Sequence, residues 1–355
     1  MSRWLSPLMA FCLSFIIIAG LAPSLGIQID RQIDFWLLWF GTMFILALPI
    51  AYLEIALAKR SKTTALNALS SLTRDADASQ RWRIVGWMAV VFIPFVAGGV
   101  LFNIGQVTVQ NTVFAAQSNI AFIILAILAL ALSYLPRQIL VILTAVTVII
   151  SLILANVFGT ALQPWHITPI EFKEWGNATI LALVASGLGL GLYWQTSFLQ
   201  IQQQENSTKT ALPIWIAQLI AVIAFGFFAM STQIPAWSMT IAAVIAAALL
   251  VQLAREQLVQ RQISIVIQFI ILSVALLVWA IPNIANILNP VLMLWGLVIC
   301  LIYSIFAGWI MKISHLRKAM NFSNELFYNL WRIAVRVVLP VSIVVAIISF
   351  IGQLI

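Results

Sequence analysis

The amino-acid sequence predicts an all-α polytopic membrane protein with about eleven transmembrane helices, and three observations carry that prediction. Of its 355 residues, 63% are hydrophobic and 8% are charged, and the mean hydropathy of +1.08 lies far above that of soluble domains. Apolar runs of roughly 20 residues, the length that crosses a bilayer core about 30 Å thick, follow one another with short polar breaks. These runs do not alternate polar and apolar residues, as the strands of a transmembrane β-barrel would.

The predicted spans form a single transmembrane domain over residues 1–355. They cover residues 7–26, 35–56, 84–108, 118–135, 138–157, 178–199, 211–230, 237–254, 263–281, 286–311 and 329–353. The first span is long, lacks a clear small-residue cleavage site and is followed closely by a second. We therefore expect it to be helix one rather than a cleaved signal. In the polar break at 59–83, the spacing of Ala65, Leu66 and Leu69 predicts a short interfacial helix.

The charge distribution predicts orientation rather than a nucleic-acid partner. The net charge is +8, and with a cytoplasmic N-terminus sixteen of the eighteen Lys and Arg residues fall on the inner side, leaving Arg31 and Lys173 outside. This asymmetry is the positive-inside rule, and the basic residues suit contact with anionic membrane lipid. We expect a bacterial inner-membrane protein with its C-terminus outside. Trp165 and Trp175, in the outer loop at 159–176, are expected at the headgroup level.

Two spans contain residues that interrupt a helix, and their positions suggest an internal repeat. Spans one and six are the first members of two successive five-helix sets, at about 7–157 and 178–311, with an extra helix at 329–353. Such an order is expected of a five-plus-five inverted repeat whose broken helices one and six meet at the membrane midplane. A break frees backbone N–H and C=O groups, which hydrocarbon cannot satisfy, so it survives only where it faces protein, water or a ligand.

The residues at the two interruptions are the candidate binding site for a small solute. They are Gly20, Ala22, Pro23, Ser24 and Gly26 in span one, and Ser186, Gly187, Gly189, Leu190 and Gly191 in span six. Pro23 strengthens the first interruption because proline has no N–H and its ring clashes with the carbonyl four residues earlier. For span six an alternative stays open, since Gly187 and Gly191 also have the GxxxG spacing of a helix-packing face. Half-helix N–H groups would favour an anionic group, and free carbonyls would hold a cation.

Other polar residues have two interpretations each. Asn103, Gln106 and Gln110 either line a vestibule or bond between helices. Ser14, Ser24, Ser186 and Thr196 either supply hydroxyls to a cavity or bond back to their own helices.

The remaining chemistry-bearing residues do not suggest catalysis. Cys12 and Cys300 are expected to be packing residues, and His166 and His315 lack partners at metal-ligand spacing. No nucleophile with a base partner and no phosphate-binding loop is recognisable in the sequence, so we expect a protein that is not an enzyme and carries no cofactor.

Three segments resemble the neurotransmitter:sodium symporter family, the group with the leucine-transporter fold. ALPIAYLEIALAKRS at 47–61 is similar to its GIPL-x-x-x-E pattern, AGLAPSLG at 19–26 to its first unwound segment, and SGLGLG at 186–191 to its second. The segments at 81–97 and 306–340 add support in the family's order. The resemblance implies alternating-access transport of an amino-acid-like solute coupled to sodium. It also implies that Glu54 is a structural charge that bonds the backbone of helix six, with proton coupling as the alternative.

The chain departs from the family at the residues that usually bind sodium and substrate. Ile27 and Ala185 stand where two side-chain ligands of sodium are expected, which leaves Gly20, Pro23 and Thr240 as candidates for a residual sodium site. Val100 or Leu101 replaces a substrate-binding tyrosine, Leu190 replaces an aromatic residue, and Arg31 is adjacent to the position of a gating arginine.

Two functions are therefore expected from different classes. The first is secondary transport of a small organic solute. The alternative is a degenerate transporter fold that serves as a structural or regulatory subunit and binds another membrane protein.

Overall fold

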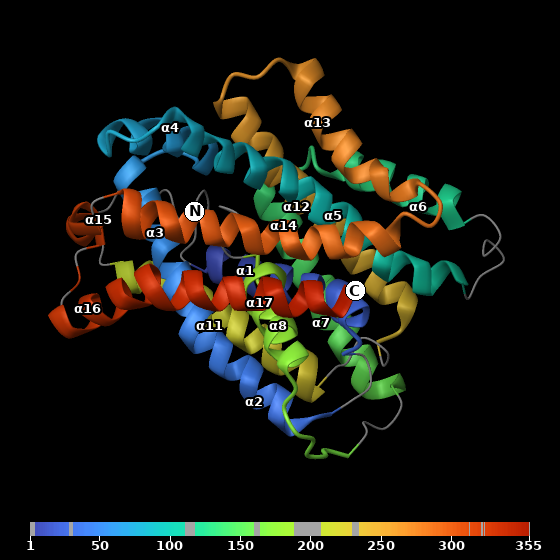
Figure 1. Ribbon diagram of the computed structural model, residues 1–355. Coiled ribbons are helices and arrows are strands. Elements are labelled where there is room, and N and C mark those ends of the chain that lie inside the picture. Colours follow the sequence, from blue (N-terminus) through green and yellow to red (C-terminus); the bar gives the residue numbers. More distant parts are fainter. Residues whose placement is uncertain are drawn as a thin grey trace.

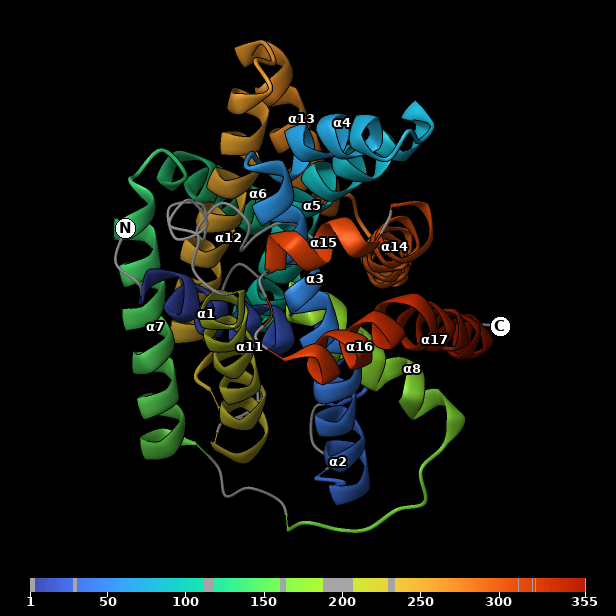
Figure 2. The ribbon, with the colours of Figure 1, turned by 90° about the vertical axis from the view of Figure 1, so that its left-hand side faces the viewer.

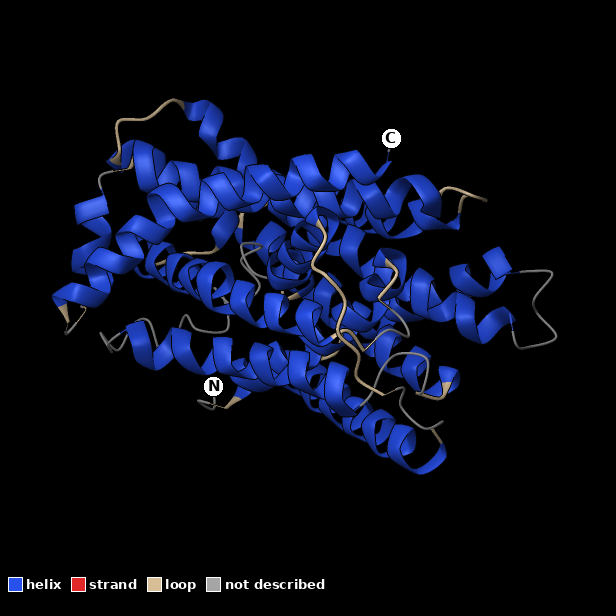
Figure 3. Cartoon of the chain, turned by 60° about the horizontal axis from the view of Figure 1, so that its bottom comes forward, coloured by secondary structure: helices blue, strands red, loops and turns tan. Residues whose placement is uncertain are grey.

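The computed structural model covers residues 1–355 and describes residues 4–27, 31–110, 118–159, 164–187, 207–228, 234–311, 313–320, 322 and 324–354. Throughout these residues the backbone is almost entirely helical and contains no β-strand (Figure 3). One isolated β-bridge joins Gln32 to His166. The all-α class predicted from the hydropathy pattern is confirmed.

The long α-helices of the described residues overlap the predicted spans, but the predicted number of about eleven is not confirmed. The α-helices are α1 (Leu5–Leu21), α2 (Ile33–Thr42), α3 (Leu48–Ser61), α4 (Ala65–Asp75), α5 (Ile84–Gln110), α6 (Ser118–Leu132), α7 (Arg137–Phe158), α8 (Phe172–Ile180), α11 (Ser207–Ile223), α12 (Ala236–Gln260), α13 (Ile265–Leu277), α14 (Ala285–Ile305), α15 (Ile313–Met320), α16 (Glu325–Ile333) and α17 (Leu339–Leu354). Among the described residues, eight helical segments are long and apolar enough to cross a membrane, and α6 and α13 are shorter apolar helices.

Narrow and wide helical turns join or end several of these helices. The 3-10 turns are η1 (Ala22–Leu25), η3 (Gln80–Arg83) and η7 (Val278–Ala280); the π-turns are η2 (Met43–Ala47), η5 (Leu181–Ala185), η6 (Ala224–Phe228), η8 (Phe306–Ile310) and η9 (Ala334–Val338). Two of the π-turns end two residues before a proline. Pro49 and Pro340 cannot donate to the helical ladder, and the wide turn before each accommodates the ring.

Helix α1 lies inside the bundle, with α7 and α11 beside it (Figure 2). It contains no charged residue, and each side chain from Cys12 to Ile18 is fully buried. A helix that is apolar on all sides has no preferred outer face, so burial in the centre is its stable position. The sequence stretch with the first interruption is therefore placed in the core.

The outer helices instead keep one apolar face uncovered. In the segment Glu325–Leu354 only 33% of the most apolar window is buried, against 83% in Leu5–Leu25. Exposed Ile142 of α7, Ile270 of α13 and Val341 of α17 are typical of these faces, which hydrocarbon tails would cover in a bilayer. Helices α14 and α17 run side by side in this outer layer (Figure 1). The protein is an integral membrane protein.

The predicted interfacial helix is α4, but its apolar face is covered by protein rather than by lipid. Leu66, Leu69 and Leu72 are all buried. The Leu66 N–H donates to the Gln257 side-chain oxygen of α12 at 3.3 Å. On the other side, Leu69 packs against Gly86 of α5. The polar break between spans two and three is therefore part of the folded core.

Trp36 of α2 packs directly onto the backbone of Gly226 in η6, the turn that follows α11. Trp36 is 1% exposed and stacks on Trp39 with ring centroids 4.9 Å apart. A Cβ atom at Gly226 would lie 2.0 Å from the Trp36 ring. Only glycine allows this approach, because an indole ring held by stacking cannot move aside at low cost.

We predict that Gly226→Ala destabilises the protein. Overpacking of this kind costs about 1–3 kcal/mol, so the melting temperature in a fixed detergent should fall. Gly41→Ala is the matched control, since a Cβ at Gly41 of α2 meets nothing within 4 Å and alanine is the better helix former. Equal melting temperatures for the two variants would contradict this prediction.

Candidate functional site

The first interruption lies at the end of span one. Helix α1 narrows into the 3-10 turn η1 and stops at Gly26, whose φ of 77° is left-handed. The Gly26 N–H donates to the Pro23 carbonyl at 3.1 Å, and the Ile27 N–H donates to the Ala22 carbonyl at 3.1 Å. This bond pair is a glycine cap that satisfies carbonyls at a helix end. The next described helix begins at Ile33.

The second interruption is present where span six was expected to break. Helix α8 widens into η5 and then turns at Ser186 and Gly187. Gly187 has a left-handed φ of 69°, and its N–H donates to the Val184 carbonyl at 3.0 Å. A residue with a Cβ rarely adopts this conformation, which explains one glycine of the motif. Gly189, Leu190 and Gly191 lie outside the described residues, so their roles stay predictions.

The carbonyl of Ser186 joins the second interruption to the middle of α1 and to α11. It accepts a hydrogen bond from the Ser14 hydroxyl of α1 at 3.2 Å and another from the Gln218 side-chain amide of α11 at 3.1 Å. All three residues are at least 99% buried. The break in span six therefore faces protein donors, as the cost of an unsatisfied carbonyl in an apolar core requires.

Gln218 was not among the residues that the sequence singled out. Its position inside the apolar span at 211–230 is the signal that could have identified it, because a buried amide needs partners. The Gln218 side-chain oxygen accepts no hydrogen bond within the described part of the chain.

Two serines of the candidate site bond back to their own helices. The Ser186 hydroxyl donates to the Ala182 carbonyl at 2.6 Å, and the Ser24 hydroxyl donates to the Leu21 carbonyl at 2.7 Å. Back-bonding was the second interpretation of these serines. Thr196 lies outside the described residues. In this structure the polar atoms at the interruptions are mainly backbone carbonyls.

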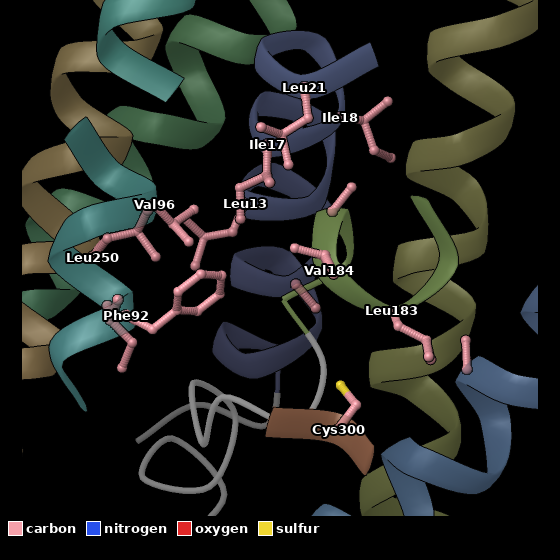
Figure 4. Packing of buried hydrophobic residues seen from close by; sticks show 14 of the residues in the cluster. Leu13, Ile17, Ile18, Leu21, Phe92, Val96, Leu183, Val184, Leu250 and Cys300 are labelled. Carbon is pink, nitrogen blue, oxygen red and sulfur yellow. The ribbon is translucent and has the colours of Figure 1, made fainter. Parts of the chain in front are cut away.

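Apolar side chains fill the space between α1, α5 and η5 (Figure 4). Leu13 and Ile17 of α1, Phe92 and Val96 of α5, and Val184 of η5 are each no more than 1% exposed. Gly296 of α14 packs against the same side chains, since an added Cβ atom there would lie 2.7 Å from the Val184 side chain. The described centre of the bundle is thus tightly packed and apolar.

A cluster of amides lies next to Gly20 on α1. The Asn103 side-chain amide of α5 donates to the Gly20 carbonyl at 3.0 Å and to the Asn289 side-chain oxygen of α14 at 2.9 Å. The Asn289 amide donates back to the Asn103 oxygen at 3.3 Å. A Cβ at Gly20 would lie 3.1 Å from the Val100 Cα, so the backbones of α1 and α5 touch here. Of the two interpretations of Asn103, interhelical bonding is the one seen.

The three candidate oxygen ligands of a sodium ion already have hydrogen-bond partners in the protein. The Gly20 carbonyl accepts from Asn103, and the Pro23 carbonyl accepts from the Gly26 N–H. The Thr240 hydroxyl of α12 lies 2.6 Å from the Thr108 hydroxyl of α5. A hard cation needs several free oxygens around one point, and these contacts leave few. The sodium site stays a prediction.

Glu54 is a buried carboxylate on α3. It is 4% exposed, and it lies close enough to Cys300 and Tyr303 of α14 to interact electrostatically with both. Its role as a structural charge stays a prediction. Cys12 and Cys300 are buried free thiols, as expected of packing residues.

On the predicted outer side, Arg31 connects the start of span two to η6, the turn that follows α11. Its guanidinium donates to the Phe227 carbonyl at 3.0 Å and lies 4.9 Å from the Trp165 ring centroid. A cation at the C-terminal carbonyls of a helix is electrostatically favourable. Burial lowers the pKa of the Arg31 guanidinium from its ordinary value, but an arginine stays protonated at neutral pH.

Comparisons with known proteins support the fold. No protein-family model matches the chain, and no curated protein matches it by sequence. Among solved structures, the chain is similar to MhsT, a transporter of the neurotransmitter:sodium symporter fold, in its crystal structure in complex with L-phenylalanine. The TM-score is 0.59, the identity is 15%, and the match covers 98% of each chain. At this identity the likeness shows a polytopic transporter-type fold.

We predict that Ser14→Ala weakens the contact between the middle of α1 and the second interruption. It removes one buried hydrogen bond between helices, which is worth about 0.5–1.5 kcal/mol. Ser304→Ala is the control, because Ser304 is equally buried but donates only within α14, to the Leu301 carbonyl at 2.8 Å. Thermal unfolding in detergent should show the larger loss for Ser14→Ala, and a larger loss for Ser304→Ala would contradict it.

Proposed function

We propose that this protein is a secondary transporter that moves a small organic solute across the membrane by alternating access. The observation that carries the proposal is that the second interruption packs in the core against the middle of α1, the helix that ends at the first interruption, through the bond from Ser14 to the Ser186 carbonyl. Paired interruptions of this kind form the binding sites of inverted-repeat transporters. The fold likeness to MhsT over nearly the whole chain supports the same function.

The side chains around the interruptions indicate the character of the solute. Because Ile17, Val96 and Val184 form apolar walls, the body of the solute would be apolar. MhsT was crystallised with L-phenylalanine, and an amino-acid-like solute is part of this proposal. Sodium coupling is proposed from the resemblance to the symporter family. Proton coupling through buried Glu54 is the alternative, because the Gly20 and Pro23 carbonyls that would bind sodium already accept hydrogen bonds. Anionic lipid contact, a cytoplasmic N-terminus and an inner-membrane location belong to the same proposal.

A second function is favoured by the packing of the centre. The side chains of Phe92, Leu13 and Val184 fill the described core. Because Gly296 has no side chain, α14 packs closely against them. Such packing suits a non-transporting subunit that uses the fold as a scaffold for another membrane protein.

The transport proposal predicts a ligand-dependent rise in stability. Purified protein is heated with a panel of amino acids and related apolar solutes, with and without sodium, since a ligand that binds only the folded state raises the melting temperature. We expect at least one solute to produce a shift and to accumulate in proteoliposomes that contain the protein. A shift that requires sodium would support coupling. Neither shift nor uptake across the panel would contradict transport.

The subunit proposal predicts a stoichiometric partner. Affinity purification of the full chain in mild detergent should then recover one membrane protein that stays bound through size exclusion. Solute uptake by the protein alone, with no partner retained, would contradict this second function.

A further inference from the structure

The amide pair of Asn103 and Asn289 lies beside the end of α1, and its bonds between helices do not use all of its hydrogen-bonding capacity. We infer that it forms a recognition site for a neutral hydrogen-bonding group on the solute, such as a carboxamide or a hydroxyl. The inference rests on the proposed transport function and names the chemistry of the solute. Neither residue belongs to the interruptions themselves; the pair comes from α5 and α14.

The hydrogen-bond inventory shows that the pair has capacity left. A carboxamide offers two N–H donors and an oxygen with two lone pairs. Asn103 uses both donors, on the Gly20 carbonyl and the Asn289 oxygen, while Asn289 uses one donor on the Asn103 oxygen. Within the described part of the chain, one N–H of Asn289 and one lone pair on each oxygen remain. A ligand could therefore both accept from and donate to the pair without breaking it.

The position of the pair makes it accessible and holds it rigidly. Both side chains are partly exposed, whereas Gly20 and Leu292 beside them are buried. Leu292 lies one turn after Asn289 and packs against Gly99 of α5. An added Cβ atom at Gly99 would lie 2.8 Å from the Leu292 side chain. The amides thus stand at the border of the apolar core, beside the end of α1.

The electrostatic surroundings favour a neutral group over an ionised one. Among the described residues, no charged side chain bonds to either amide. Arg31, the buried cation next to span two, is held by the Phe227 carbonyl and the Trp165 ring. An ionised carboxylate brought to the pair would lose water without meeting a counter-charge, which is costly, whereas an amide would keep its hydrogen bonds.

Two matched pairs of probes test the inference by thermal shift and uptake. Glutamine with glutamate, and isovaleramide with isovalerate, differ in an amide against a carboxylate that is ionised at neutral pH. We expect at least one amide to stabilise the wild-type protein while its carboxylate does not. Asn103→Leu removes the bonds to Gly20 and Asn289 and should weaken binding of that amide by about 10-fold or more.

Two further variants separate recognition from folding. Asn289→Asp keeps the oxygen that accepts from Asn103 but loses both N–H groups, the one on the Asn103 oxygen included, and should also weaken amide binding; its melting temperature, measured alongside, separates that loss from unfolding. Asn156→Leu is the matched control, because Asn156 is exposed on α7 and donates only to its own helix, at Leu152; its amide affinity should equal that of the wild type.

Three results would overturn the inference. They are equal binding of the carboxylates, unchanged amide affinity in folded Asn103→Leu and Asn289→Asp, and no response of the wild type to either amide. A purely structural pair would lower the melting temperature without changing the apparent affinity. The transport proposal is judged apart from these, by uptake of the wider solute panel.

Discussion

The structure depends on one constraint: every backbone polar group freed by a helix interruption must find a partner inside the protein. The Ser186 carbonyl is the clearest case, since it is buried and is held by Ser14 and Gln218 from two other helices. An unsatisfied carbonyl in such surroundings costs about 1–3 kcal/mol. The interruptions therefore position their neighbours, because α1 and α11 must approach closely enough to donate.

The same constraint explains the use of tryptophan and glycine elsewhere in the bundle. At the wide turn before Pro49, two indole N–H groups bond backbone carbonyls: Trp215 donates at 2.9 Å to Met43, whose carbonyl also accepts from the Leu48 N–H, and Trp331 donates at 3.1 Å to Pro49. Glycine then allows large rings to reach the backbone, as at Gly226. Helix irregularity and aromatic packing are thus coupled, and a change at one site is felt by the helix that supplies its partner.

The apolar centre of the bundle and the polar border beside it together indicate what kind of solute the protein would bind. Around Val184 the core is closed by aliphatic and aromatic side chains, while the amides of Asn103 and Asn289 stand one step outward, beside Gly20. A solute with an apolar body and a neutral polar group would match both regions. The same tightly packed centre favours the role of a non-transporting subunit. Whether a solute can reach the core therefore distinguishes transport from that role.

The sequence alone determined the fold class, because hydropathy over windows of about 20 residues depends on composition and not on partners. It also located both interruptions, since Pro23 and Gly187 act through local backbone conformation. It did not identify Gln218 or Asn289, and it left Asn103 and Ser186 with two interpretations. Only the tertiary structure decided these, because a side chain's hydrogen-bond partner is set by which helices lie next to each other, and residues 14, 186 and 218 become neighbours only when the bundle packs.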